Sequence, residues 1–116
     1  MTLNLYGLKK CTTCQKAMTW LDERDIAYTF SDVKEDPITK RQVADWSKAL
    51  GGWEKMINRA GYTWRGLPAD QTANLTESNA VKLALENPSL IHRPLIEYPD
   101  GSVTVGFSKK VQELLG

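Results

Sequence analysis

Two cysteines, Cys11 and Cys14, are the side chains of this sequence best suited to covalent chemistry. Before them, Leu3–Tyr6 alternates between apolar and polar residues, which predicts a short strand. After them, the positions i, i+3, i+4 and i+7 of one helical face are Cys14, Ala17, Met18 and Leu21. Cys11 therefore lies where a strand turns into a helix, and free backbone N–H groups and the helix dipole stabilise a thiolate there. We expect Cys11 to be the nucleophile.

The surroundings of the two cysteines predict different roles for them. Lys9 and Lys10 add positive charge beside Cys11, and such surroundings lower a cysteine pKa from about 8.5 to roughly 3.5–7.5. Cys14 lies on the apolar helix face, so it is either a small buried hydrophobe or a resolving thiol, because the i, i+3 spacing permits a disulfide. Zinc is not expected, because a closed site needs four ligands and only His92 is an obvious third.

Length and composition indicate an ordinary globular protein. The chain has 116 residues, enough for one domain with a core, and its net charge is +1. Near-neutral charge argues against general nucleic-acid binding, which needs an excess of lysine and arginine. No apolar run approaches the roughly 18 residues of a membrane span, and no signal peptide is evident. We therefore expect a cytoplasmic protein without membrane contact, in which two cysteines are more often catalytic than structural.

The two ends of the chain are predicted to form a sheet. Ile26–Asp32 alternates again, so the N-terminal part is a βαβ unit with parallel strands. Near the other end, Pro94–Tyr98 and Val103–Phe107 flank a turn and predict a hairpin, and Ser108 then caps a last helix. The fold class is therefore α/β, with βαβ and ββα parts. Residues 1–116 are expected to be a single domain, with halves at about 1–34 and 89–116.

The block between these halves, about 36–88, is predicted to be helical. Start and stop signals predict three helices in it. The first begins at Asp36-Pro37 and ends at Gly51-Gly52, a short one extends from Trp53 to Ile57, and the third begins at Thr76 and ends at Asn87-Pro88. The stretch 59–68 is expected to be irregular. Tryptophans 46, 53 and 64 are interpreted as packing residues.

This order of elements resembles the thioredoxin-like fold of the ArsC/Spx/YffB family, the arsenate reductase-like proteins. The residues that carry the likeness are Leu5-Tyr6-Gly7, Cys14–Ala17 with Trp20-Leu21, residues 58–68, Arg93–Ile96 and Val105–Phe107. The middle of the chain is similar to YffB, and the cysteine pair is similar to that of Spx. The resemblance covers nearly the whole chain, and it implies a thioredoxin-like βαβ…ββα fold with a helical insertion.

The resemblance also implies site residues. Pro94 matches the cis-proline opposite the active cysteine, which would place Arg93 next to Cys11. In arsenate reductases the cysteine attacks an oxyanion that three arginines hold, and Arg59 and Arg93 match two of them. Phe107 stands in the region of the third, so we expect weak arsenate reduction.

Backbone N–H groups of the first helical turn, at Thr12 and Thr13, are expected to add to the binding of negative charge.

The implied function is a thiol-dependent oxidoreductase that attacks a small oxyanion or a disulfide. No bound cofactor is expected; glutathione or glutaredoxin is the implied co-substrate or partner, and Cys14 or glutathione resolves the intermediate. The alternative is a regulator similar to Spx, which binds RNA polymerase and senses oxidation through the cysteine pair. Turnover separates the two, because only an enzyme consumes thiol together with a substrate.

Overall fold

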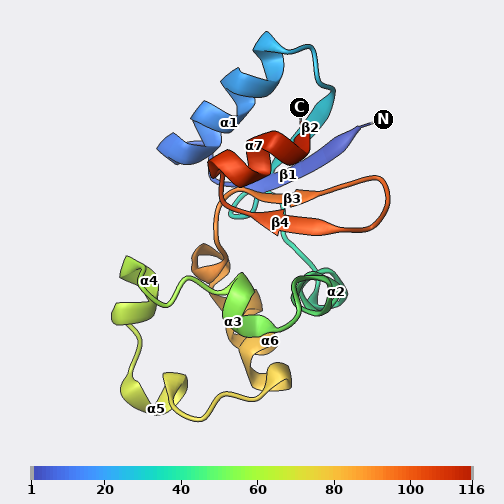
Figure 1. Ribbon diagram of the computed structural model, residues 1–116. Helices are drawn as coiled ribbons and strands as arrows, with labels where there is room; N and C mark the ends of the chain where they lie inside the picture. Colours follow the sequence, from blue (N-terminus) through green and yellow to red (C-terminus); the bar gives the residue numbers. More distant parts are fainter. Residues whose placement is uncertain (1, 116) are drawn as a thin grey trace. The chain divides into compact units, whose positions relative to one another are not determined.

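The computed structural model describes residues 2–115, which form two compact units (Figure 1). The first unit combines the segment up to Asp36 with the segment from Arg93 onward, and the second comprises Pro37–His92. The first unit is therefore discontinuous in sequence.

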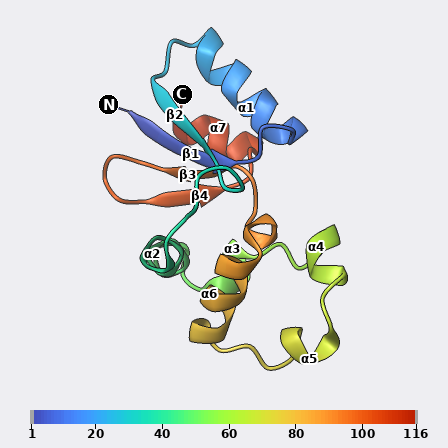
Figure 2. The same cartoon turned by 180° about the vertical axis from the view of Figure 1, so that it is seen from behind.

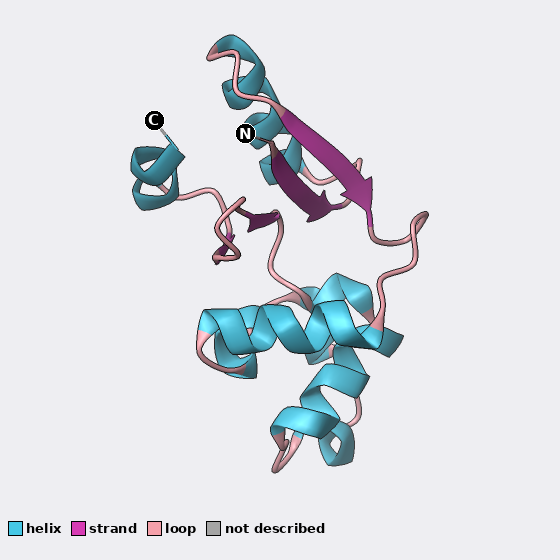
Figure 3. Cartoon of the chain, turned by 90° about the vertical axis from the view of Figure 1, so that its right-hand side faces the viewer, coloured by secondary structure: helices cyan, strands magenta, loops and turns pink. Residues whose placement is uncertain are grey.

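The first unit is built on a mixed sheet of four strands in the order β2-β1-β3-β4. The strands are β1 (Leu3–Gly7), β2 (Tyr28–Asp32), β3 (Leu95–Glu97) and β4 (Val103–Val105). β1 pairs with β2 in parallel and with β3 antiparallel, and β3 and β4 form a hairpin (Figure 1). The strands are the magenta segments of Figure 3. The predicted βαβ unit and hairpin are confirmed, although β2 begins two residues after Ile26 and the hairpin strands are shorter than predicted.

Two helices, α1 (Thr12–Glu23) and α7 (Lys109–Leu115), complete this unit. Buried and half-buried residues alternate along β1, so that one side of the strand contributes to a core. That core consists of Leu3, Leu5, Ala17, Leu21, Ile96 and Val111. Since these residues come from β1, α1, β3 and α7, the α/β, thioredoxin-like fold expected from the sequence is confirmed.

The second unit is helical within the described residues. Its helices are α2 (Lys40–Leu50), α3 (Trp53–Met56), α4 (Tyr62–Arg65), α5 (Ala69–Thr72) and α6 (Glu77–Glu86), followed by the 3₁₀ helix η1 (Pro88–Leu90). α2 contacts both α3 and α6, and α3 also contacts α6 (Figures 1 and 2). The buried side chain of Trp46 on α2 is the largest of this core, as its interpretation as a packing residue required.

The predicted helix boundaries at Thr76 and Gly51 agree with the structure, whereas the predicted start of α2 does not. Thr76 caps α6, and Gly51 ends α2 with a φ of 88°, a conformation that favours glycine. The predicted start of α2 at Asp36-Pro37 is wrong. Thr39 caps the helix instead: its hydroxyl accepts the N–H of Gln42 at 3.1 Å, and its own N–H donates to the Gln42 amide at 2.8 Å.

The expectation of an irregular stretch at 59–68 is wrong in part, because α4 forms there. α4 and α5 are single turns of four residues and carry no buried side chain. An apolar face is the pattern that predicts a helix, so helices of this kind leave no such signal.

Within residues 2–115, no helix has both the length and the apolar character that a membrane crossing requires.

Candidate functional site

Cys11 occupies the N-cap position of α1, after a short loop that follows β1. Its backbone is extended, with φ −77° and ψ 121°, and its N–H donates to the carbonyl of Leu8 at 3.0 Å. An N-cap side chain lies beside the free N–H groups of the first helical turn. Cys11 is partly exposed and Cys14 is buried, and both are free thiols. The strand–helix junction therefore presents one sulfur to solvent and keeps the other inside.

The pKa of Cys11 is lowered because several hydrogen-bond donors outweigh its partial burial. Burial by itself raises the pKa of the thiol. The backbone N–H of Cys14, the Cys14 thiol, the Arg93 guanidinium and the backbone N–H of Thr13 act in the opposite direction and favour the thiolate. The Cys11 side chain makes no capping hydrogen bond to the first turn of α1 in the structure. The N–H groups of this turn therefore stabilise the sulfur when it is ionised.

The Cys14 thiol has the opposite character. Burial is the main cause that raises its pKa to about 11, and its contact with the Cys11 sulfur acts in the same direction. A Cβ placed on Gly7 would collide with the Cys14 sulfur, so this thiol is packed directly against the end of β1. Cys14 therefore stays protonated at neutral pH and donates its hydrogen to the Cys11 thiolate.

Arg93 and Pro94 reach this site from the start of the C-terminal segment. The Arg93–Pro94 peptide bond is cis, as the resemblance implied. Pro94 is buried, and its carbonyl accepts the N–H of Gly106 at 2.9 Å. The Arg93 side chain hydrogen-bonds the Cys11 sulfur and thereby favours its charged form. The structure thus brings together Cys11, Cys14 and Arg93 within the first unit.

Thr12 and Thr13 begin α1, with exposed side chains. The N–H of Thr13 contributes to the lowered pKa of Cys11.

Lys9 does not act on Cys11 in the way we expected. Its ammonium group forms an ion pair with Glu35 at 2.7 Å. The groups that lower the pKa of Cys11 are N–H groups, the Cys14 thiol and Arg93.

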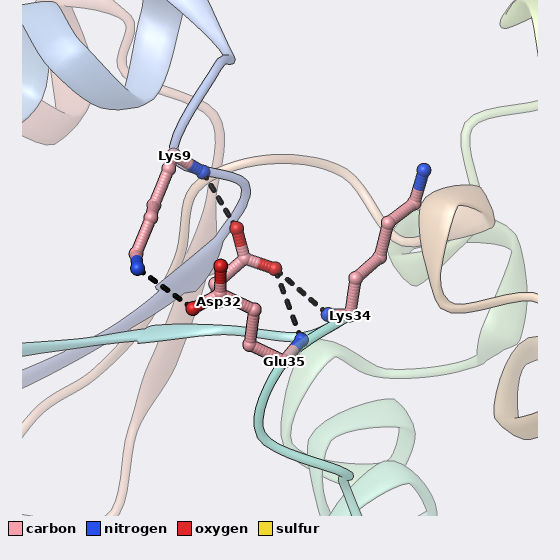
Figure 4. A network of polar contacts seen from close by, with 4 residues as sticks. All are labelled: Lys9, Asp32, Lys34 and Glu35. Carbon is pink, nitrogen blue, oxygen red and sulfur yellow. Dashed lines mark hydrogen bonds and ion pairs between the residues drawn. The ribbon is translucent and has the colours of Figure 1, made fainter.

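A carboxylate that was not among the predicted site residues, that of Asp32, lies beside the cysteine loop. Asp32 ends β2 and is paired with Gly7 in the parallel register. Its side chain accepts the backbone N–H groups of Lys9 at 2.9 Å and Lys34 at 2.8 Å (Figure 4). The signal was present in the sequence, because two parallel strands that end together place their last residues side by side. An acidic residue at the end of the second strand is therefore expected near the cysteine loop.

Two further residues that the resemblance singled out are Arg59 and Phe107. Arg59 belongs to the second unit, where it is exposed and its guanidinium lies 5.5 Å from the centroid of the Trp53 ring. That ring is stacked on Trp64 with a centroid separation of 6.2 Å. Phe107, in the first unit, packs edge-on against Trp20 at 5.6 Å and borders the core. In the region where the resemblance implied a third arginine, Phe107 therefore serves hydrophobic packing.

No three histidine, cysteine, aspartate or glutamate side chains among residues 2–115 are grouped as a metal site would require.

Comparisons with known proteins identify relatives along nearly the whole chain. A solved structure of a protein called YFFB is 42% identical, with a TM-score of 0.89, and the match covers 97% of this chain and 96% of that one. The structure of an arsenate reductase (ArsC) related protein from Brucella melitensis is 38% identical, with a TM-score of 0.79 and coverage of 98% and 93%. The global transcriptional regulator Spx of Streptococcus agalactiae is 30% identical over 81% of this chain and 69% of its own length.

The comparison with family models agrees with these relatives. The model of the ArsC family matches residues 6–113, a range that includes both cysteines and Arg93. The match therefore extends over most of the chain and over the whole cysteine site. The chain belongs to the ArsC family.

Proposed function

We propose that this protein is a thiol-dependent oxidoreductase, with Cys11 as the nucleophile and Cys14 as the resolving thiol. The observation that carries the proposal is the contact between two unequal cysteines. Cys11 is partly exposed and has a lowered pKa, whereas Cys14 is buried and has a pKa of about 11. A thiolate is the attacking species in thiol–disulfide exchange, and a protonated neighbour within reach supplies the second thiol.

The reaction that this pair supports is a two-step exchange. The Cys11 thiolate attacks one sulfur of a disulfide R–S–S–R′, and the S–S bond breaks. R′–S⁻ leaves, and the R–S group stays bonded to the Cys11 sulfur as a mixed disulfide. Cys14 then loses its proton to solvent and attacks the Cys11 sulfur, which releases R–S⁻ and forms the Cys11–Cys14 disulfide. Two glutathione thiols, or one dithiol partner of the glutaredoxin class, reduce this bond and are themselves oxidised.

Glutathione is the co-substrate that we propose, in the cytoplasm, where it is abundant. Arg93 carries the positive charge at Cys11, and it suits a carboxylate of glutathione as well as a thiolate. We propose Arg59 as a further anion ligand on the family resemblance alone. A small oxyanion such as arsenate is expected to be a poor substrate, because the region where the resemblance expects a third arginine holds Phe107, which packs on Trp20.

Mass spectrometry after exposure to oxidised glutathione tests the proposal. The wild-type protein is expected to end as an intramolecular disulfide, 2 Da lighter than the reduced form. The variant Cys14→Ser should instead retain one glutathione on Cys11, and Cys11→Ser should remain unmodified. Modification of Cys14 in the Cys11→Ser variant, or an unchanged wild-type protein, would contradict the assignment of roles.

A regulator similar to Spx is the second candidate, because the Spx relative is 30% identical. In that case the Cys11–Cys14 disulfide changes the affinity for RNA polymerase and no substrate is turned over. The two candidates differ in a coupled assay. Catalytic consumption of glutathione with a disulfide substrate supports the enzyme, whereas redox-dependent binding to purified RNA polymerase without turnover supports the regulator.

A further inference from the structure

The carboxylate of Asp32 is buried beside the cysteine loop and is held almost entirely by backbone groups. Only 7% of the residue is exposed. One carboxylate oxygen accepts the N–H of Lys9 at 2.9 Å, and the other accepts the N–H of Lys34 at 2.8 Å and, more weakly, that of Glu35 at 3.4 Å (Figure 4). One side chain thus joins the end of β2 to the loop that follows β1.

The neighbouring ion pair does not take over this role. The ammonium group of Lys9 extends to the Glu35 carboxylate at 2.7 Å, and both side chains are more than half exposed. An exposed pair of this kind contributes little to stability, because water screens the charges and two long side chains must be held in one geometry. The main-chain bonds to Asp32 are better shielded from water, so they restrain the loop more strongly than the ion pair does.

Further hydrogen bonds connect the backbone around Lys9 to the surroundings of both cysteine sulfur atoms. The carbonyl of Lys9 accepts the side-chain amide of Gln15 on α1 at 2.9 Å, and the N–H of Cys11 donates to Leu8 at 3.0 Å. The N–H of Leu8 also acts on the Cys14 sulfur. The loop that Asp32 holds is therefore the loop that fixes where Cys11 lies relative to the first turn of α1.

We propose that Asp32 is a positioning residue for the Cys11 thiolate, acting through the backbone N–H of Lys9. This inference rests on the proposed function, because it concerns the reactivity of Cys11. Asp32 touches no reacting atom in this role. It keeps Cys11 in the N-cap position, where the N–H groups of α1 and the Arg93 guanidinium stabilise the negative charge.

Replacement of Asp32 distinguishes positioning from a simple effect of charge. In Asp32→Asn the amide nitrogen cannot accept an N–H, so the bond to Lys9 or the bond to Lys34 is lost. Removal of a negative charge alone would favour the thiolate and shift the pH profile of Cys11 to lower pH. Loss of position removes the N–H donors from the sulfur and shifts the profile to higher pH. The two effects thus differ in sign.

The experiment measures the alkylation rate of Cys11 by iodoacetamide from pH 5 to pH 9, with each cysteine followed by mass spectrometry. We expect Cys11 of Asp32→Asn to react about three- to tenfold more slowly than the wild type at pH 6, and its profile to lie at higher pH. An unchanged profile, or one at lower pH, would overturn the inference. A wild-type protein in which Cys14 reacts first would instead contradict the proposed function, whatever Asp32 does.

Two control variants separate position from charge and stability. Glu35→Gln removes the ion pair with Lys9 and leaves the Asp32 bonds in place, so it should behave like the wild type. Asp100→Asn changes another carboxylate that accepts a backbone N–H, that of Ser102 at 2.9 Å in the hairpin turn, and it should also leave Cys11 unchanged. Circular dichroism confirms that each variant is folded.

A measurement on the wild-type protein keeps the inference testable if Asp32→Asn does not fold. The pKa of Asp32 is lowered by the N–H groups of Lys9 and Lys34, so its stabilising bonds persist above about pH 3.9 and are lost as the pH falls further, through its folded pKa. In an NMR titration the amide signals of Lys9 and Cys11 should shift with one common midpoint below pH 3.9. A Cys11 signal that does not follow that of Lys9 would overturn the inference.

Discussion

At the scale of single residues, the contact between the two sulfur atoms moves their pKa values in opposite directions. The Cys14 thiol is a donor to the Cys11 thiolate, and the same contact makes Cys14 harder to ionise. The sequence predicted this asymmetry from the helix position of each cysteine, but it attributed the added positive charge to lysines. Arg93 is remote in sequence, and only the family resemblance indicated it.

Arg93→Ala should raise the pKa of Cys11, because it removes a charged donor from the thiolate. We expect alkylation of Cys11 at pH 6 to slow about three- to tenfold, the lower part of the range for a charge-assisted bond, because Cys11 is partly exposed. Arg24→Ala is the matched control, since Arg24 lies over the Trp20 ring at the other end of α1. Equal rates in Arg93→Ala and the wild type would contradict the role of Arg93.

Cys14 should make the fold less stable at high pH. Its pKa is about 11 in the folded protein and about 8.5 when unfolded, so between these values the unfolded state loses a proton that the folded state keeps. The free energy of unfolding therefore falls as the pH rises through this window. From pH 8 to pH 10 we expect the wild type to lose about 1–2 kcal/mol more than Cys14→Ala, measured by urea unfolding. Parallel losses in the two proteins would show that Cys14 is not the cause.

At the scale of elements, the packing of α1 on β1 depends on the absence of a side chain at Gly7. A Cβ there would collide with the Cys14 sulfur, while Phe30 at 3.6 Å is an ordinary contact. Gly7→Ala should destabilise the protein by about 1–3 kcal/mol, the usual range for overpacking. The loss should be much smaller when Cys14 is also alanine, which denaturant unfolding of the two single variants and the double variant would show.

Gly66 provides the control for this double-mutant cycle. It ends α4 with a φ of −83°, and a Cβ there would meet only carbonyl oxygens at 3.6 Å. Gly66→Ala should therefore be neutral or slightly stabilising. Equal losses from Gly7→Ala with and without Cys14 would mean that the contact between strand and helix is not the cause.

Local signals explain which elements could be predicted. Strands with alternating residues, and helices with an apolar face such as α1 and α6, were identified from their periodicity. The start of α2 was misplaced because Pro37 and Thr39 are competing signals only two residues apart, and the paired bonds of Thr39 and Gln42 decide between them. The Asp32 bonds have no local signal, because they join residues on two different elements; only the parallel pairing of the first two strands indicates that Asp32 lies near the cysteine loop.

At the scale of the whole molecule, the order of the strands in the sheet follows from the way consecutive strands can be connected. The division of the chain into two units follows instead from how its side chains pack. Parallel strands need a crossover, and α1 supplies it between β1 and β2. The helical block was predicted at about 36–88, and the second unit spans Pro37–His92. The arginine that contacts Cys11 is far from it in the sequence. Contacts of this kind leave no periodic pattern from which they could be predicted.

Reaction of Cys14 with an external reagent should report on the stability of the first unit. Its side chain is fully buried between α1 and β1, so a bulky alkylating agent reaches it only when these elements separate. Leu21→Ala, in the same core, should speed alkylation of Cys14 at least about thirtyfold, as a loss of about 2 kcal/mol or more implies. Leu114→Ala, at an exposed position, should not change it. Equal rates in the two variants would mean that Cys14 is accessible in the native protein.

The discontinuous first unit has a consequence for biosynthesis. Strand β1 has β2 on one side and β3 on the other, and the ribosome releases β3 only after the whole helical block has been made. Arg93 arrives with it, long after the cysteines have emerged. A nascent chain therefore carries Cys11 without its guanidinium partner, and the thiol gains its full acidity only when the C-terminal hairpin joins the sheet. The order of synthesis thus separates the appearance of the Cys11 thiol from the completion of its site.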